Sequence, residues 1–247
     1  MVILKTILFD LDNTIVNDSR AIKMAFTKLK ERYSFFKNMP VNKLIYDFYN
    51  CDYDTIGLIR SGKIGIQEAF PRKVELFLKE ERLNLDEQVV DYIGENIRET
   101  HIDCCRLFSG TERLLSLLKG EYRILVITNF IGEYQKEKIS KLGIAKYIDD
   151  VIPSYDFSCA KPQREIFEIA IERSGCAPSE AVMIGDDWNA DIKGAFSVGI
   201  IPIWVNFKND PAPSRDFKNI IRTYEPAYEI KKKIEEFHSI GIERVHL

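Results

Sequence analysis

Carboxylates follow two apolar runs that lie far apart in the sequence. Residues 6–9 are followed by Asp10 and Asp12, and residues 181–184 are followed by Gly185 and Asp186. A carboxylate can act as a nucleophile, a general acid or a general base, and it is a preferred ligand of hard cations. If these carboxylates converge, their repulsion costs energy unless a cation is bound. The pattern therefore predicts a cation site built from oxygen ligands, with Mg²⁺ as the expected ion.

A second group of residues is suited to binding an anion. Thr128 and Asn129 end another apolar run, residues 123–128, and Lys161 stands before a helical pattern. Lysine carries a compact charge that suits a phosphate oxygen. A phosphate dianion beside two ionised aspartates carries a charge of about −4, and Mg²⁺ with one lysine returns about +3. The predicted site can therefore hold a phosphate group close to electrical neutrality.

Buried strands are needed to bring these residues together. Short apolar runs that end in polar or turn residues predict strands, and amphipathic patterns such as residues 164–174 predict helices between most of them. Strands that alternate with helices indicate a parallel sheet covered on both faces, so the expected fold is α/β with a Rossmann-like, doubly wound core. Ligands of such sheets bind at the carboxyl ends of the strands. The predicted strands are residues 6–9, 123–128, 151–153, 181–184 and 201–205.

A helical insertion interrupts the alternation after the first strand. Nothing resembling a strand follows until about residue 122, and the intervening pattern has helical periodicity. We expect an α/β core formed by residues 1–15 and 105–247, with a small all-α cap domain at residues 16–104. The helices expected in the cap are residues 19–33, 65–79 and 86–100, and residues 228–237 are expected to form a last amphipathic helix.

The composition of the chain excludes several classes of function. The 247 residues carry a formal net charge of −3 without a long block of one sign, so no nucleic-acid polymer is expected as a partner. No apolar run approaches the roughly 18 residues that would suggest a membrane span, and the start lacks the cleavage site of a secretory signal. Five irregularly spaced cysteines favour reduced thiols and a cytoplasmic location. Three scattered histidines do not predict a histidine-built metal site, and nothing indicates the oligomeric state.

The ordered motifs resemble those of a known superfamily. The segments Asp10-Leu11-Asp12-Asn13-Thr14, Thr128-Asn129, Lys161-Pro162 and Gly185-Asp186-Asp187-Trp188-Asn189-Ala190-Asp191 look like the four motifs of the haloacid dehalogenase superfamily. The resemblance covers the whole core, and the insertion resembles that family's helical-cap class. It implies a Mg²⁺-dependent phosphatase that acts on a small phosphate monoester, such as a sugar phosphate, a nucleotide or a related metabolite.

The resemblance also implies a role for each motif residue. Asp10 is the expected nucleophile that forms an aspartyl-phosphate, and Asp12 is the expected general acid and base. The metal is expected on the Asp10 carboxylate, the Asp12 backbone carbonyl and Asp186. The phosphate oxygens are expected on the Thr128 hydroxyl, the Asn129 backbone N–H and Lys161.

Two further aspartates of the last motif have less defined roles. Asp187 and Asp191 either support the site or cap the first turn of the following helix. In the supporting role, Asp191 is expected to orient a metal-bound water or Lys161.

Two departures bear on the subgroup and the substrate. Asn13 resembles the branch that contains pyrimidine nucleotidases and N-acylneuraminate-9-phosphatase. Phe130 stands where glycine is common in that branch, and a ring there would narrow the leaving-group pocket and disfavour nucleotides. Two alternative functions stay open: a phosphotransferase or phosphomutase that uses the same intermediate, and a non-catalytic protein that binds a phosphorylated metabolite.

Overall fold

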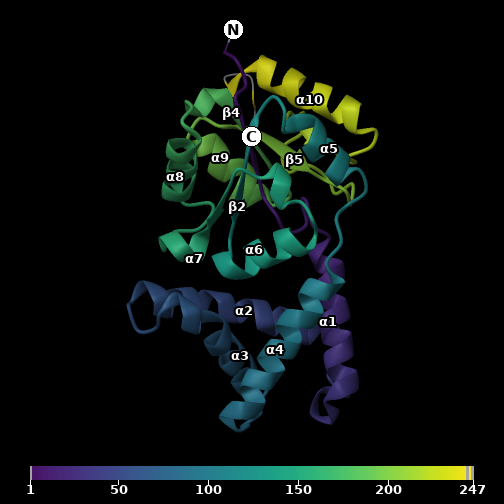
Figure 1. Cartoon of the computed structure of the whole chain (residues 1–247), viewed down its shortest axis with the longest axis vertical. Coiled ribbons are helices and arrows are strands. Elements are labelled where there is room, and N and C mark those ends of the chain that lie inside the picture. The colour runs from purple at the N-terminus through teal and green to yellow at the C-terminus, as the bar shows by residue number, and fades with distance from the viewer. Residues whose placement is uncertain (1, 243–244, 246–247) are drawn as a thin grey trace. The chain divides into compact units, whose positions relative to one another are not determined.

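The chain divides into two compact units. The computed structural model describes residues 2–242 and 245. One unit, here called the α/β unit, comprises residues 1–17 and 107–247, and the other, the helical unit, comprises residues 18–106 (Figure 1). Each boundary lies two residues from the position expected from the sequence, so the insertion begins directly after the first strand and its turn.

Six parallel strands form the sheet of the α/β unit. Their spatial order is β3-β2-β1-β4-β5-β6, which confirms the doubly wound α/β fold class. The chain runs outward in one direction from β1 to β3 and in the other from β4 to β6, so its direction reverses between β1 and β4. The strands are β1 (Thr6–Phe9), β2 (Arg123–Thr128), β3 (Asp150–Pro153), β4 (Ala181–Gly185), β5 (Ile201–Val205) and β6 (Ile220–Ile221).

The register of the central strands brings their carboxyl ends level. Phe9 at the end of β1 lies opposite Val126 of β2 and Ile184 of β4. The side chains of β1 are buried throughout, because helices cover both faces of a parallel sheet. The residues that follow β1, β2 and β4 therefore emerge at one edge of the sheet.

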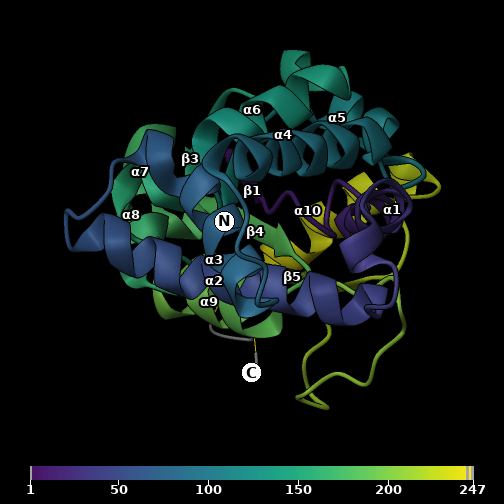
Figure 2. The same ribbon diagram turned by 90° about the horizontal axis from the view of Figure 1, so that it is seen from below.

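Helices cover the two faces of the sheet. The helices α8 (Arg164–Ser174) and α9 (Gly194–Ser197) pack on one face, and α5 (Thr111–Leu118) and α10 (Ala227–Ile240) pack together on the other (Figure 2). Helix α8 has the predicted bounds, whereas α5 was not predicted. The remaining elements of this unit are α6 (Gly132–Lys141), η3 (Ala145–Tyr147), α7 (Ser154–Phe157), η4 (Pro178–Glu180) and the π-helix η5 (Trp188–Lys193).

The helical unit has an aromatic core of its own. Phe26, Phe48 and Phe77 are buried and meet edge to face, with ring centroids 5.4–5.7 Å apart. Such pairs stabilise a small core beyond the apolar area that they bury. The elements are α1 (Asp18–Arg32), η1 (Ser34–Phe36), α2 (Val41–Arg60), η2 (Ile66–Glu68), α3 (Ala69–Glu80) and α4 (Glu87–Cys104).

Candidate active site

Three carboxylates meet where the strand order reverses. Asp10 follows β1, and its backbone N–H donates to Ile184 O of β4 at 2.9 Å. Asp186 follows β4, and Asp191 lies in η5. One carboxylate oxygen from each of Asp10, Asp186 and Asp191 lies within 4.8 Å of the others. The crevice at this point of a doubly wound sheet is where such folds bind ligands.

Lys161 supplies a positive charge inside this group. Its Nζ donates to Asp10 Oδ1 at 2.6 Å and to Asp191 Oδ1 at 2.7 Å, and its side chain is only 2% exposed. Asn129 holds the backbone of Lys161, because its side-chain amide donates to Lys161 O and accepts from Lys161 N. The end of β2 and the start of the Lys161 segment are thereby joined.

Negative charge remains in excess despite the lysine. Burial, together with the charges of Asp191 and Asp186, holds the pKa of Asp10 well above its ordinary value, although Lys161 opposes that shift. Burial and the nearby Asp191 raise the pKa of Asp186 to about 7. Burial would lower the pKa of Lys161, but the charges of Asp10 and Asp191 outweigh it and raise that pKa. Each ionised carboxylate is therefore costly unless further positive charge is bound.

The arrangement fits a bound divalent cation. Asp10 Oδ2 is buried and has no hydrogen-bond partner among the described residues. A buried acceptor of this kind costs free energy unless something binds it. The group of ligand atoms consists of carboxylate oxygens, which are the donors that Mg²⁺ prefers. Asp10 and Asp186, two of the residues that the sequence suggests as metal ligands, therefore lie in one group of carboxylates.

Local backbone geometry sets the position of Asp191. Its Oδ2 accepts from the backbone N–H of Asp187 at 3.0 Å, so the chain folds back after β4. A Cβ on Gly185 would overlap the Asp191 carboxylate, which explains why glycine ends β4. Of the two roles weighed from the sequence, the contacts of Asp191 are those of a residue that orients Lys161.

Asp187 caps η5 and is exposed. Its carboxylate accepts from Asn189 N at 2.8 Å and Ala190 N at 2.7 Å. These are the bonds of an N-cap aspartate. The contacts of Asp187 therefore match the capping role that was one of the two possibilities weighed from the sequence.

Asp12 lies at the same edge but faces α6. Lys138 Nζ donates to Asp12 Oδ1 at 2.6 Å, and Gln135 Nε2 donates to Asp12 Oδ2 at 2.7 Å. Gln135 Nε2 also donates to Thr128 Oγ1 at 2.7 Å, and Thr128 is buried at the end of β2. Sequence reasoning missed Gln135 and Lys138, because polar residues in a charged helix such as α6 usually face water.

The turn after Asp12 requires an unusual backbone conformation. Asn13 has a φ of 64°, in the left-handed region that asparagine tolerates better than most residues do. Glycine would suit the same φ, so this position is constrained by the turn itself. The next residue, Thr14, is buried, and its Oγ1 donates to Asp186 Oδ1 at 3.4 Å.

Comparison with known proteins identifies the family. The model of the haloacid dehalogenase-like hydrolases matches residues 4–199, which is more than half of the chain. The chain belongs to this hydrolase family. A glyceraldehyde 3-phosphate phosphatase from Methanocaldococcus jannaschii is 30% identical to the hydrolase over 201 residues, which cover 81% of this chain and 84% of the relative. The HAD-hydrolase YfnB from Bacillus subtilis is 28% identical over 246 residues, which cover 97% of this chain and 96% of the relative.

A solved structure shares the fold of the hydrolase. The crystal structure of YfnB from Bacillus subtilis bound to magnesium aligns with a TM-score of 0.70 and 24% identity, covering 93% of this chain and 99% of that chain. At this identity the likeness bears on the fold alone.

Tyr224 is a further buried polar residue beside the acidic group. Its side chain is only 1% exposed, and its hydroxyl has no hydrogen-bond partner among the described residues. Burial, followed by the charges of Asp10 and Asp186, raises the pKa of Tyr224 well above its ordinary value. The neutral phenol is therefore retained. No motif pointed to this residue, because it follows the short β6 strand, which was not predicted.

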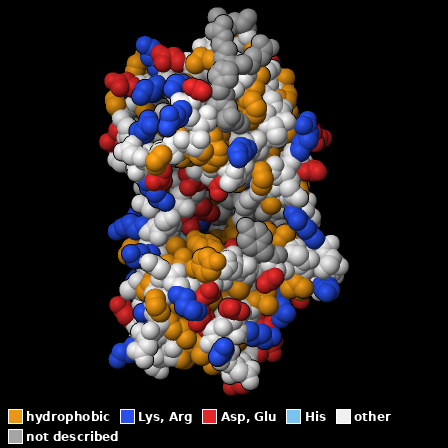
Figure 3. All heavy atoms as spheres, turned by 180° about the vertical axis from the view of Figure 1, so that it is seen from behind, with side chains coloured by type: hydrophobic (Ala, Val, Ile, Leu, Met, Phe, Trp, Pro, Cys, Tyr) orange, Lys and Arg blue, Asp and Glu red, His pale blue; other side chains and the backbone are white. Residues whose placement is uncertain are grey.

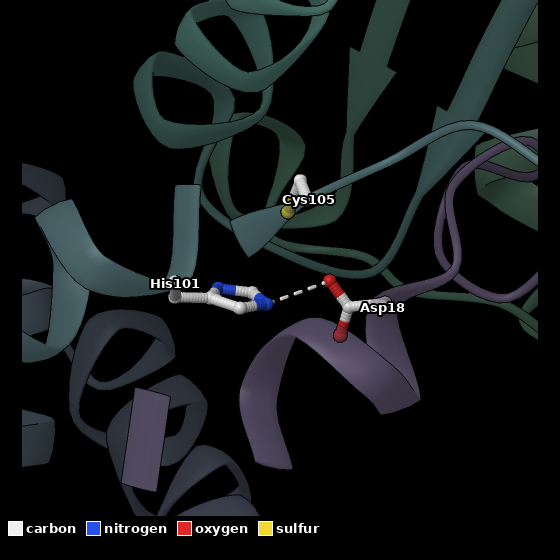
Figure 4. A group of neighbouring side chains, drawn as sticks. All are labelled: Asp18, His101 and Cys105. Carbon is white, nitrogen blue, oxygen red and sulfur yellow. Dashed lines mark ion pairs between the residues drawn. The ribbon is translucent and has the colours of Figure 1, made fainter. Parts of the chain in front are cut away.

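The helical unit of the hydrolase contains a second group of potential metal ligands. Asp18, His101 and Cys105 are buried, and one ligand atom from each lies within 4.8 Å of the others (Figure 4). His101 Nε2 lies 2.9 Å from Asp18 Oδ1, and Tyr49 donates to Asp18 Oδ2 at 3.1 Å. The sequence did not predict this convergence of an imidazole and a carboxylate. Both oxygens of Asp18 already have partners within the unit, which suits a structural role for the pair.

Charged side chains of both signs are mixed on one face of the hydrolase. Lys and Arg side chains are interspersed with Asp and Glu over the face seen in Figure 3. Binding to a nucleic-acid backbone requires a continuous basic region instead. Among the described residues, no helix combines the length and the apolar character needed to cross a bilayer.

Proposed function

We propose that the protein is a Mg²⁺-dependent phosphatase that carries the phosphoryl group of a small phosphate monoester on Asp10. The observation that carries the proposal is the uncompensated acidic group at the sheet edge, in which Asp10 is held by Lys161 and retains one oxygen without a partner. Membership of a hydrolase family and relatives named as phosphatases support the same conclusion.

The first step transfers the phosphoryl group to the protein. An Asp10 oxygen forms a bond to phosphorus while the bond from phosphorus to the leaving oxygen breaks. Lys161 orients Asp10 through its bond to Oδ1. Asp12 donates a proton to the leaving alkoxide, so that an alcohol departs.

The second step returns the nucleophile. Asp12, now ionised, takes a proton from water, whose oxygen attacks the phosphorus of the aspartyl-phosphate. The bond from phosphorus to Asp10 breaks, and inorganic phosphate leaves with the carboxylate restored. One residue thus serves as acid and then as base, which requires that it stay within reach of both departing and entering oxygens.

Thr128, Asn129 and Lys161 are proposed to bind the phosphate oxygens. Because Thr128 Oγ1 accepts a hydrogen bond from Gln135, its own proton is available for another acceptor. The Asn129 side chain is engaged with the backbone of Lys161, which leaves its backbone N–H as the proposed donor. These donors act where charge develops on the phosphoryl group.

Asp10, Asp186 and the backbone carbonyl of Asp12 are the proposed holders of Mg²⁺. When bound, the ion neutralises part of the excess negative charge and polarises the phosphoryl group. The carbonyl of Asp186 accepts from the indole N–H of Trp204 at 2.8 Å, and this bond fixes the backbone that carries the ligand. Such support orients a ligating carboxylate before the metal arrives.

We propose that the helical unit is a cap that selects the leaving group. The helical unit begins at Asp18 and ends at Arg106, and it has its own hydrophobic core. It can therefore act as one body. A cap favours small metabolites over phosphoproteins. Phe130 contacts the rings of Tyr134 and Tyr155, which makes a rigid aromatic group directly after Asn129.

The test is phosphate release from a panel of monoesters. The panel includes glyceraldehyde 3-phosphate, because the relative from Methanocaldococcus jannaschii is named as a phosphatase of this compound. The other members are glycerol 3-phosphate, p-nitrophenyl phosphate and a pyrimidine nucleoside 5′-phosphate. Wild type and Asp10→Asn are compared with Mg²⁺ and with a chelator. The expected result is stoichiometric release of phosphate that requires both Mg²⁺ and Asp10. Substrate loss without free phosphate would indicate transfer to a second acceptor, and no turnover of any ester would contradict the proposal.

A further inference from the structure

Helix α6 binds the carboxylate of Asp12, the proposed acid/base residue, from its buried side. Both of its carboxylate oxygens accept a bond from this helix, one from Lys138 and one from Gln135. The side chain of Lys138 is 2% exposed, whereas that of Asp12 is 29% exposed. Asp12 is thus fixed on its buried side while part of its surface remains accessible.

Gln135 connects Asp12 to the phosphate site. Its Nε2 carries two hydrogens, and it donates to Asp12 Oδ2 and to Thr128 Oγ1, both at 2.7 Å. In the ionised form that acts as the base of the second step, the Asp12 carboxylate only accepts hydrogen bonds, so the amide turns its nitrogen toward Asp12. The spacing between the acid/base residue and the end of β2 is therefore set by one buried side chain.

Burial of the polar side chains of Gln135 and Lys138 costs free energy that apolar residues would not. Positions 135 and 138 share one face of α6 because they are three residues apart, and both are buried. Burying an amide or an ammonium group costs free energy that its partners must offset, and apolar residues would fill the same space without that cost. Lys136, on the exposed face of the same helix, shows the ordinary position of a lysine in α6.

We propose that Gln135 and Lys138 are positioning residues that hold the Asp12 carboxylate where it gives its proton to the leaving oxygen. The inference rests on the proposed function and adds two residues to it. Each Asp12 oxygen has two lone pairs, so one bond from α6 still leaves room for the transferred proton. A misplacement of about 1 Å in a reacting group can reduce a rate by about 10²-fold.

The test compares two leaving groups in the same variants. The alkoxide of glycerol 3-phosphate needs a proton to depart, whereas the nitrophenolate of p-nitrophenyl phosphate is stable without one. We expect Lys138→Met and Gln135→Met to reduce kcat/KM for glycerol 3-phosphate by about 10- to 100-fold. For p-nitrophenyl phosphate the reduction should be about threefold or less, and Lys136→Met should leave both values unchanged.

A double-variant cycle separates positioning from a general structural effect. In an Asp12→Asn background, adding Lys138→Met should reduce the rate constant for glycerol release in the first turnover of glycerol 3-phosphate by no more than about twofold, because the group being positioned is already absent. Equal losses on both esters, or an undiminished loss in the Asp12→Asn background, would overturn the inference. If one variant does not fold, as judged by circular dichroism, the other still decides between these results. A folded wild-type protein that releases phosphate from no ester of the full panel would instead contradict the proposed function.

Discussion

Two buried lysines, one in each unit, have opposite electrostatic surroundings. Lys161 in the α/β unit bonds two carboxylates that are themselves buried, and their charges raise its pKa. Lys73 in the helical unit is equally buried, and burial lowers its pKa, although Asp52 at 2.7 Å opposes the shift. The ammonium of Lys73 lies 4.0 Å from the ring centroid of Phe48, which supplies a further favourable contact.

The difference separates a site from a structural ion pair. Around Lys161 the carboxylates outnumber the lysine, so the group is complete only with more positive charge. Lys73 pairs with Asp52, whose side chain is 23% exposed and can therefore be solvated by water. Burial of a lysine therefore does not identify a functional residue, whereas an imbalance of buried charge does.

The largest expected effect is the loss of turnover when the proposed nucleophile is replaced, which also reduces the excess of negative charge around Lys161. Asp10→Asn should lower kcat by at least about 10³-fold, because the amide cannot carry the phosphoryl group. The melting temperature should not fall, since one of several mutually repelling carboxylates has been removed. Phosphate release and thermal denaturation measure the two effects. Activity near that of wild type would contradict the covalent route.

The next largest effect is a loss of stability when the positive charge of Lys161 is removed and the excess of buried negative charge grows. Lys161→Met should lower the free energy of unfolding by about 3–5 kcal/mol at neutral pH without Mg²⁺, because buried carboxylates then lose their cationic partner. Denaturant titration measures the change. A loss below about 1 kcal/mol would mean that the carboxylates are already protonated or hydrated.

A smaller effect depends on pH through Asp186. Its pKa in the folded protein, about 7, lies above its ordinary value of 3.8, so the folded state binds more protons than the unfolded state between these values. Stability should therefore fall as the pH rises from about 4 to about 7 when Mg²⁺ is absent. Relative to wild type, Asp186→Asn should gain roughly 2–4 kcal/mol over this interval.

The measurement for Asp186 is denaturant unfolding of wild type and Asp186→Asn at several pH values with a chelator. Added Mg²⁺ should stabilise wild type above about pH 7 and should have less effect on the variant, since a ligand that binds only the folded state stabilises it. Parallel pH profiles of the two proteins would show that Asp186 does not titrate in this range.

The smallest effect is expected in the helical unit. Lys73→Met should change the free energy of unfolding by about 1 kcal/mol or less, because an apolar side chain can replace a buried charge and Asp52 regains contact with water. Phosphate release should keep its Mg²⁺ dependence. A destabilisation as large as that of Lys161→Met would remove the distinction between the two lysines.

The sheet and the ends of its strands were predictable because their signal is local. Strands β1, β2 and β5 have the predicted bounds, since each is a short apolar run buried on both faces. The acidic residues after β1 and β4 followed from the same runs. Strand β6 has only two residues, which is too short for a pattern to mark.

The contacts of Asp12 were not predictable, because they depend on how a charged helix is turned. In α6, Lys136 and Lys138 are two residues apart, yet one is exposed and the other is buried. A sequence pattern treats both as surface residues. Likewise, Asp18 and His101 lie at opposite ends of the helical unit in sequence and meet only through its fold.

The most direct test of the account is to trap the phosphoryl group on Asp10. With p-nitrophenyl phosphate and Mg²⁺, Asp12→Asn should complete the first step, which needs no acid for this leaving group, and stall before the second, which needs a base. A rapid acid quench should then show a burst of p-nitrophenol equal to the enzyme present, with the phosphoryl group on the peptide that contains Asp10. Steady release without a burst or a labelled peptide, or a phosphoryl group on another residue, would contradict the account.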